Sequence, residues 1–326
     1  MFLIPNEWGY RNGMQEAKET DPDSFELYEK SVGCFQIGCK PKTTAEIPNL
    51  IKRDHLRTQG VGCNDLEFSE KYMSTGKFDV YIWMAVVGDK FIMCKYIYDT
   101  DKKESKKVKG EIKKAKACLK TIIVIEEERK EEILSSERFT KFMNSLSASI
   151  DLKNRAYENG SSIELVVLLA NQIDALLRLT LILKKQIDNS TNGIDTTLIF
   201  QSETDRPIME KKVYKMALDE GIITQHLHNK LFELYNQRNK VIHRYIITDL
   251  LTRDVMQIVY DYTIMEEKVG EVVKEYEQKQ FKLKIGIYGT DTPPDHPIDE
   301  EMKQKIIGAI KEKHAHNEIN KDITFK

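Results

Sequence analysis

The sequence is short of net charge, of cysteine and of any long uninterrupted apolar run, and each shortage excludes a class of protein. Its 326 residues include 50 Lys and Arg against 52 Asp and Glu, which gives a formal net charge of −2. No positive field covers the whole molecule, so a surface for nucleic acid would have to be local. The five cysteines are an odd number, which indicates reduced thiols rather than a disulfide framework and predicts a cytoplasmic protein.

Three of the cysteines could be combined with a histidine into a zinc site. The set is Cys34, Cys39, His55 and Cys63. Its spacings match no common pattern of zinc ligands, and buried cysteines are frequent in ordinary cores. We therefore expect unmodified thiols, with no metal and no other cofactor.

No segment predicts a signal peptide or a membrane span. The first ten residues, MFLIPNEWGY, have no basic region and no long apolar run. The longest apolar stretch, residues 162–183, contains Glu164, Asp174 and Arg178. Inserting these charges into a bilayer would cost several kcal/mol in total. We expect this stretch to be a core helix of a soluble protein.

What the chain does have is an ordinary globular composition, with 40% hydrophobic and 31% charged residues, and enough length for about two domains. Residues 1–150 predict an α+β domain. Its runs 78–87 and 90–98 are rich in β-branched and aromatic side chains, and Gly88-Asp89 between them is a hairpin signal. The role of this domain is unknown from the sequence; regulation or sensing of the rest of the chain is one interpretation.

A block of strong charge closes this first domain. Residues 101–120 hold nine lysines and two glutamates, and the acidic run EEERKEE follows over residues 126–132. One interpretation is a solvated connector helix with opposite charge blocks, and the other is a basic strip for a phosphate backbone.

Residues 151–280 predict helices joined by short connections, which is the pattern of an up-and-down bundle. A capping box of Ser161 and Glu164 opens a helix expected over residues 162–186. The second helix has Pro207 near its first turn and Gly221 at its C-terminal stop, and the third begins after Thr224. The fourth is expected to begin after Thr248 or Asp249 and to run to about Gln280.

The tail, residues 281–326, predicts a strand, a turn and a helix. FKLKIGIYG over residues 281–289 alternates in the manner of a strand, prolines at 293–297 mark a turn, and an amphipathic helix runs to about Lys313.

In the third helix of the bundle, a cationic side chain occupies a position where the helical periodicity predicts an apolar residue. At about 100° per residue, an apolar stripe forms, and Arg238 lies in its middle. The stripe consists of Leu227, Leu231, Leu234, Val241, Ile242 and Tyr245. Asn239 and His243 lie along its flank, one turn apart. A guanidinium in an apolar stripe costs several kcal/mol unless it meets an anion or a water-filled cleft.

Two interpretations of this arginine stay open from the residues alone. In the first, Arg238 is buried and paired with Asp174 or Glu233, and His243 is an ordinary surface histidine. In the second, Arg238 and His243 converge on a phosphate, where the arginine supplies charge and the histidine moves a proton.

The run from Arg238 to His243, R-N-K-V-I-H, resembles the R-N-x-x-x-H signature of HEPN domains. These are all-α bundles found in many prokaryotic toxin and phage-defence ribonucleases. The resemblance covers about residues 150–280 and implies a HEPN-like four-helix bundle there. Asp174 and Arg178, on the long apolar helix that precedes the motif, are possible supporting polar residues.

Tyr245 extends the match to R-x4-H-x-Y, the variant seen in HEPN toxins paired with MNT nucleotidyltransferase antitoxins. Those toxins are typically short single-domain proteins, whereas this chain has an added N-terminal domain and a tail. Two roles stay open for Tyr245. The resemblance implies a modification target, and its place on the apolar stripe favours a core residue.

The resemblance also implies an activity, which is cleavage of RNA without metal through attack of the ribose 2′-hydroxyl on the adjacent phosphate. His243 would be the general acid and base, and Arg238 would stabilise the phosphorane-like transition state. Asn239 would orient the imidazole or hold phosphate. Two protomers usually pair so that both motifs face one cleft.

We therefore expect an RNA endonuclease of HEPN type, a toxin or abortive-infection effector, whose partners are RNA, a second copy of the chain bound through the bundle, and an antitoxin or trigger protein. The apolar helix at residues 162–186 motivates the homodimer, because a lone bundle would struggle to bury it. One alternative is a non-catalytic HEPN scaffold for dimerisation or docking. The other is a binding protein whose function lies in residues 1–150.

Overall fold

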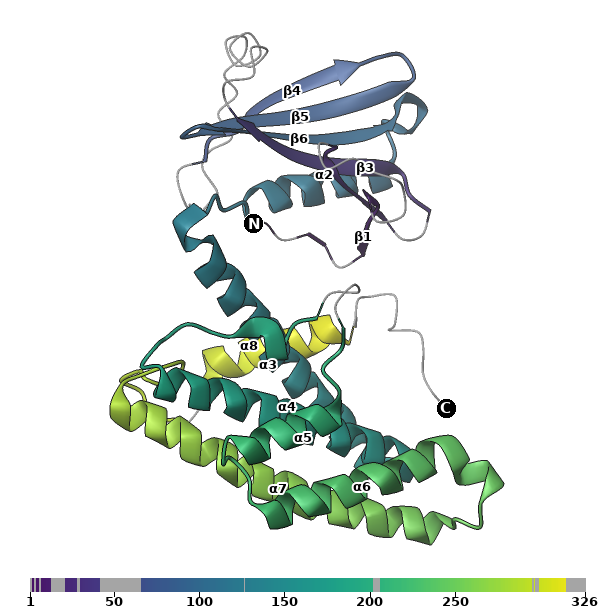
Figure 1. The fold of residues 1–326 in the computed structure, drawn as a ribbon. Coiled ribbons are helices and arrows are strands. Elements are labelled where there is room, and N and C mark those ends of the chain that lie inside the picture. The colour runs from purple at the N-terminus through teal and green to yellow at the C-terminus, as the bar shows by residue number, and fades with distance from the viewer. Residues whose placement is uncertain are drawn as a thin grey trace. The chain divides into compact units, whose positions relative to one another are not determined.

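The computed structural model divides into two compact units, Met1–Glu126 and Glu127–Lys326, which are described separately (Figure 1). It describes residues 2, 4–5, 7–12, 21–27, 30–41, 66–125, 127–201, 206–294, 296 and 299–314. A six-stranded antiparallel sheet precedes a series of helices, so the expected α+β class is confirmed. The boundary lies near residue 126 rather than 150, because α3 (Glu127–Glu158) packs with the helices that follow it.

The first unit is built on one antiparallel sheet in the order β1-β2-β3-β6-β5-β4. The strands are β1 (Trp8–Tyr10), β2 (Asp23–Leu27), β3 (Gly33–Pro41), β4 (Ser69–Ser74), β5 (Phe78–Val87) and β6 (Lys90–Asp99). The expected hairpin is confirmed, since Val87 pairs with Lys90 and Gly88 turns the chain with a φ of +57°. That left-handed conformation is the one that favours glycine in a two-residue turn.

The lysine-rich block is a structural helix of this unit. It forms α2 (Lys106–Leu119), whose N-cap Ser105 accepts a hydrogen bond from the Lys107 amide at 3.2 Å. Its apolar side, which includes Val108 and Ala115, packs with Trp83 of the sheet in one core. Three of its lysines form ion pairs, Lys109 with Glu104, Lys114 with Glu7 and Glu111, and Lys116 with Glu70. It is therefore packed on the sheet rather than a solvated connector.

The second unit consists of helices built on one large apolar core and a second, smaller one. They are α3, α4 (Ser162–Asp188), the 3-10 helix η3 (Thr196–Leu198), α5 (Glu210–Asp219), α6 (Gln225–Arg244), the 3-10 helix η4 (Tyr245–Ile247), α7 (Thr252–Leu283) and α8 (Glu300–Lys313). The four helices expected over residues 151–280 correspond to α4 to α7, and the helix expected to end at Lys313 is α8. The sequence did not show that α3 packs against α4 as part of the same unit.

The central helix of this unit is α4, and its burial corrects the argument for a dimer. α4 is long and apolar enough to cross a membrane, yet 67% of its most apolar window is buried inside the unit. It contacts α3, α5, α6 and α7, and side chains such as Leu169, Ile173 and Ile182 are fully enclosed. One chain thus buries this helix, which therefore gives no reason for a second copy.

Helix starts follow the sequence signals only in part. Thr224 caps α6 as expected, since its hydroxyl accepts a hydrogen bond from the Leu227 amide at 3.2 Å. The side chain of Ser161 makes no cap hydrogen bond, although α4 begins at the next residue. α7 begins at Thr252, later than expected, because Asp254 accepts a hydrogen bond from the Leu251 amide at 2.9 Å and fixes the start there.

The strand expected over residues 281–289 is wrong. Residues 281–283 are the last turn of α7, and the left-handed conformation of Lys284 ends the helix. No strand lies beside the segment among the described residues of this unit, so its backbone bonds to side chains instead. The Tyr288 amide donates to Gln280 at 3.0 Å, and the Gln280 side chain donates to Leu183 O at 3.0 Å and Gln186 Oε1 at 2.8 Å.

Because Leu177 is fully buried at the centre of the core, Leu177→Ala is expected to destabilise the helical unit by about 2–5 kcal/mol. Urea unfolding followed by circular dichroism measures the loss. Asn171→Ala is the matched control, because Asn171 is exposed on the same helix and should change stability by less than about 0.5 kcal/mol. Equal midpoints for the two variants would contradict this account of the core.

Candidate functional site

α6 carries the residues of the motif, and its apolar stripe faces the core. Leu231, Leu234 and Val241 are buried, and the stripe packs against α4 and α7. Ile242 differs from the expectation, since 42% of it is exposed. It lies at the edge of the stripe in the last turn of the helix, where the core no longer covers it.

Arg238 lies within this stripe and is paired inside its own chain. Its side chain is 15% exposed, and its Nη1 forms an ion pair with Oε2 of Glu210, which begins α5 and is 12% exposed. The guanidinium also lies 4.8 Å from the ring centroid of Tyr235. The pairing with an anion agrees with the first interpretation, but the partner is neither Asp174 nor Glu233.

Two tyrosines complete the surroundings of the ion pair. The Tyr214 hydroxyl donates a hydrogen bond to Glu210 Oε1, so both carboxylate oxygens are engaged. Tyr262 of α7 is fully buried in the same core, and burial, together with the charge of Glu210, raises the pKa of its hydroxyl. Burial raises the pKa of Glu210, although Tyr214 and Arg238 act in the opposite direction. The cost of desolvating this carboxylate is thus only partly offset by its partners.

Asp174 and Arg178 form a second pair on α4. Arg178 Nε donates to Asp174 Oδ2 at 2.7 Å, and its Nη1 and Nη2 donate to Leu198 O and Ile208 O, each at 2.6 Å. Burial raises the pKa of Asp174 against the effect of Arg178, and the charge of Arg238 also reaches this carboxyl. Arg178 thus holds the connection from which Glu210 extends.

Some polar atoms in and beside these two pairs keep unused hydrogen-bonding capacity. Asp174 Oδ1, Arg238 Nε and the Tyr262 hydroxyl are buried and have no hydrogen-bond partner among the described residues. Leaving such groups unsatisfied costs about 1–3 kcal/mol each. The interior around the two ion pairs therefore contains two hydrogen-bond donors and one acceptor that have no partner among the described residues.

His243 lies at the surface, in the last turn of α6. Asn239, one turn before it, is half-buried, and its Oδ1 accepts a hydrogen bond from Arg238 Nη2 at 3.4 Å, the long end of the range. The motif thus combines a paired Arg238 and a half-buried Asn239, which are in contact, with an exposed His243 one turn further on.

Tyr245 begins η4 directly after α6. It is half-buried against the core of the unit, and its hydroxyl lies 3.0 Å from Thr252 Oγ1. This position agrees with a packing role at the turn between α6 and α7.

The four residues that were weighed as a zinc set and set aside belong to the first unit, and only two of them are described. Cys34 and Cys39 lie on β3, half-buried and exposed respectively, while His55 and Cys63 fall outside the described residues. Within the described part of the chain, no group of three or more His, Cys, Asp or Glu side chains is arranged to hold a metal ion.

The residues that the sequence did not single out are Glu210, Tyr214 and Tyr262. Glu210 stands in the first turn of α5, where an acidic residue is an ordinary complement to the helix dipole. Tyr214 follows one turn later and Tyr262 belongs to an apolar repeat. No local signal distinguishes them, because their role comes from contacts distant in sequence.

Removing the partner of Arg238 is expected to destabilise the helical unit. Glu210→Ala leaves Arg238 Nη1 and the Tyr214 hydroxyl without their acceptor, at a cost of about 2–3 kcal/mol, below the ~3–5 kcal/mol of a fully buried pair. Glu210→Gln should cost less, because the amide oxygen can accept from Arg238 and the amide nitrogen can donate to Tyr214, so both hydrogen bonds are kept although Arg238 loses its counter-charge.

Urea unfolding measures both variants of Glu210. Glu233→Ala is the control, since Glu233 forms an exposed pair with Lys230 on α6 and should change stability by less than about 1 kcal/mol. A Glu210→Ala variant as stable as Glu233→Ala would show that the Arg238 pair contributes nothing.

Comparisons with known proteins assign no family. No protein-family model matches the chain, and the search of curated proteins gave no significant match. Among solved structures, a crystal structure from Bacteroides thetaiotaomicron VPI-5482 is similar at 14% sequence identity, over 74% of this chain and 75% of that one, with a TM-score of 0.28. A similarity at this TM-score assigns neither a fold family nor a function.

Proposed function

We propose that the chain is a metal-independent RNA endonuclease of HEPN type, acting in the cytoplasm as a toxin or phage-defence effector, with its site at the C-terminal end of α6. One observation carries the proposal. The helix that bears the R-N-x-x-x-H pattern exposes His243 in its last turn, while Arg238 is held at the edge of the core with its Nη2 directed to Asn239.

In the proposed reaction the nucleophile comes from the substrate. His243 takes the proton of a ribose 2′-hydroxyl, whose oxygen attacks the adjacent phosphorus. The bond from phosphorus to the 5′ oxygen breaks, and a protonated imidazole returns a proton to that leaving oxygen. The products are a 2′,3′-cyclic phosphate and a free 5′-hydroxyl.

Arg238 would stabilise the charge that develops on the phosphate. Its ion pair with Glu210 constrains how it can do so, because that contact already engages Nη1. Nε has no partner among the described residues but is buried, so Nη2, which donates only a long hydrogen bond to Asn239, is the group left to face a phosphate beside His243. Glu210 and Tyr214 would then position the guanidinium, and Asn239 would connect the arginine to the histidine.

The reaction is expected to proceed in excess EDTA, because no step needs a metal. A labelled RNA should be cut to products with 2′,3′-cyclic phosphate ends, and its deoxy analogue should survive, since it lacks the nucleophile. End-group analysis of the products is the measurement. Loss of cleavage in EDTA, or cleavage of the deoxy strand, would rule out the roles assigned to Arg238 and His243.

His243→Ala should reduce this cleavage by about a hundredfold or more, the usual contribution of a general acid or base, and should relieve growth inhibition on expression. His226→Ala is the matched control, since His226 is exposed in the first turn of the same helix. Equal activity of the two folded variants would show that His243 is not catalytic.

A second copy of the chain is proposed to complete the site. The turn between α6 and α7 carries an exposed apolar surface, called the tip surface, made by Ile242, Ile246, Ile247 and Leu251, which are 42%, 94%, 78% and 49% exposed. Exposed apolar patches mark association sites. His243 belongs to the same turn of chain, so contact through the tip surface would bring two motifs together.

The charges around the tip surface favour pairing with itself. The segment carries charges of both signs, Arg244 and Arg253 with Asp249 and Asp254, and Arg253 Nε lies 3.8 Å from Asp254 Oδ1. A two-fold interface needs a surface that complements itself. This replaces α4 as the reason for expecting a dimer, because α4 is buried within one chain.

Light scattering is expected to show a dimer at micromolar concentration, and Ile246→Asp with Ile247→Asp is expected to give a monomer with unchanged helix content. Because these two side chains are almost fully exposed, their replacement should not disturb the core. Tyr260→Asp, an exposed position further along α7, is the control. A wild-type monomer would remove the composite site.

The alternative function is a non-catalytic scaffold for dimerisation or docking. The observation that favours it is the Glu210 pair, which neutralises Arg238 within the chain. A scaffold would form the dimer through the tip surface and yet cleave no RNA with or without His243. The cleavage and light-scattering measurements together therefore separate the two functions.

A further inference from the structure

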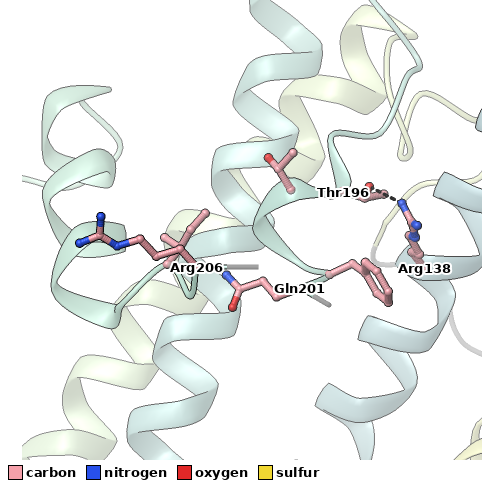
Figure 2. A pocket seen from close by; sticks show the side chains of 7 residues that line it. Arg138, Thr196, Gln201 and Arg206 are labelled. Carbon is pink, nitrogen blue, oxygen red and sulfur yellow. Dashed lines mark hydrogen bonds between the residues drawn. The ribbon is translucent and has the colours of Figure 1, made fainter. Parts of the chain in front are cut away.

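A cavity of about 520 Å³ lies in the helical unit between α3 and the connection of α4 to α5. Figure 2 shows Arg138 and Thr196 at one end, Gln201 in the middle and Arg206 at the other end. The volume is within the range of about 300–1,000 Å³ that is usual for small-molecule sites. This cavity, called the Arg138 cavity, includes no residue of the motif on α6.

The lining of the Arg138 cavity is cationic and partly aromatic. Arg138 Nη1 donates to Thr196 Oγ1 at 3.3 Å, and its guanidinium lies 4.2 Å from the ring centroid of Phe200. None of the described residues that line the cavity is acidic. Within the described part of the chain, no ion pair joins Arg138 or Arg206 to a carboxylate. A guanidinium without a carboxylate, fixed by a hydroxyl and a ring, is suited to bind an anion.

A neighbouring cavity on the same connection has the opposite character. It has a volume of about 540 Å³ and shares Thr197 and Ile208 with the Arg138 cavity. Lys184 and Lys185 line it together with four carboxylates, which belong to Asp188, Asp195, Asp219 and Glu220. Among the described lining residues, carboxylates therefore occur only in this neighbouring cavity, so an anion is favoured in the Arg138 cavity.

We propose that the Arg138 cavity binds a ligand that joins a phosphate group to a flat aromatic ring, either a free nucleotide or one nucleotide unit of single-stranded RNA. The guanidinium of Arg138 takes the phosphate, and the hydroxyl of Thr196, which accepts from Arg138, can donate to it. Phe200, 46% exposed, offers its ring for stacking of the base. The amide of Gln201 can donate to and accept from the edge of the base.

The phosphate is assigned to Arg138 alone. The guanidinium of Arg206 is directed away from Arg138 in Figure 2, and its side chain is exposed. Arg206 therefore contributes long-range attraction at the rim of the cavity, and its removal should weaken binding less than removal of Arg138.

Occupation of the cavity is linked to the motif through a short stretch of chain. Arg178 holds the carbonyls of Leu198 and Ile208, each at 2.6 Å, and Ile208 lines the cavity. Glu210, two residues further, pairs with Arg238. One short segment, residues 208–210, therefore lies between the cavity and the partner of Arg238.

Isothermal titration of the full chain tests the proposal, with His243→Ala as the background so that no RNA is consumed. The probes are AMP, adenosine, inorganic phosphate and a short single-stranded RNA. AMP or the RNA should bind, and phosphate or adenosine alone should bind at least about tenfold more weakly. Arg138→Gln should weaken binding about tenfold or more, equivalent to about 1.4 kcal/mol, and Phe200→Ala should also weaken it.

Arg129→Gln is the matched control, because Arg129 lies on the same helix, is 64% exposed and does not line the cavity. Circular dichroism confirms that each variant is folded. Binding of AMP that depends on Arg138 identifies a free nucleotide as the ligand, and Arg138-dependent binding of RNA alone identifies a unit of the strand; both support the proposal.

Three results would overturn the proposal: no binding of AMP or RNA, equal affinities for Arg138→Gln and Arg129→Gln, or phosphate binding as tightly as AMP. Because the titration measures no cleavage and His243 is absent from the cavity, its outcome is independent of the proposed ribonuclease activity. If the chain binds nucleotide but cleaves no RNA, the nucleotide site is supported and the proposed ribonuclease activity is rejected.

Discussion

The three hydrogen-bonded contacts of Arg178 fix the geometry of the helical unit on which its candidate sites depend. This arginine projects from α4, the most deeply buried helix, pairs with Asp174 and donates to the carbonyls of Leu198 and Ile208. A buried guanidinium must satisfy its donors, and here it does so by holding the connection between α4 and α5. The start of α5, and with it Glu210, is placed as a consequence.

This arrangement explains how an arginine can occupy the apolar stripe of α6. The stripe packs Leu231, Leu234 and Val241 into the core, and Arg238 at its centre receives Glu210 from the neighbouring helix. The ion pair, the Tyr214 hydroxyl and the side chain of Asn239 together make a polar strip at the edge of an apolar interface. The same strip constrains the proposed site, because a phosphate bound there would contact Arg238 while Glu210 is also paired with it.

The two proposed sites are joined by one chain segment, but the arginines in them have different neighbours. At α6, the cation is neutralised within the chain and the exposed His243 stands beside an apolar tip surface. At the Arg138 cavity, the cation has a hydroxyl and an aromatic ring as neighbours. The first arrangement favours chemistry or assembly that needs a second molecule, whereas the second favours direct capture of an anion.

The sequence by itself determined the features that depend on local spacing. Alternation and a Gly-Asp turn gave the β5–β6 hairpin, and periodicity gave the helices and the place of Arg238 among apolar residues. Where a pattern needs a distant partner, the sequence was insufficient. The segment after α7 alternates like a strand, yet its backbone bonds to Gln280 and Gln186, since no strand lies beside it among the described residues of the unit.

Only the tertiary structure decided which anion meets Arg238, where the units divide and which cavity has no carboxylate among its described lining residues. Glu210 precedes Arg238 by 28 residues and carries the same local signal as any acidic residue in a first helical turn. Its selection over Asp174 and Glu233 follows from how α5 is held against α4 and α6, and such contacts are non-local. Helical periodicity tells which residues share a face, but the packing of helices determines what that face meets.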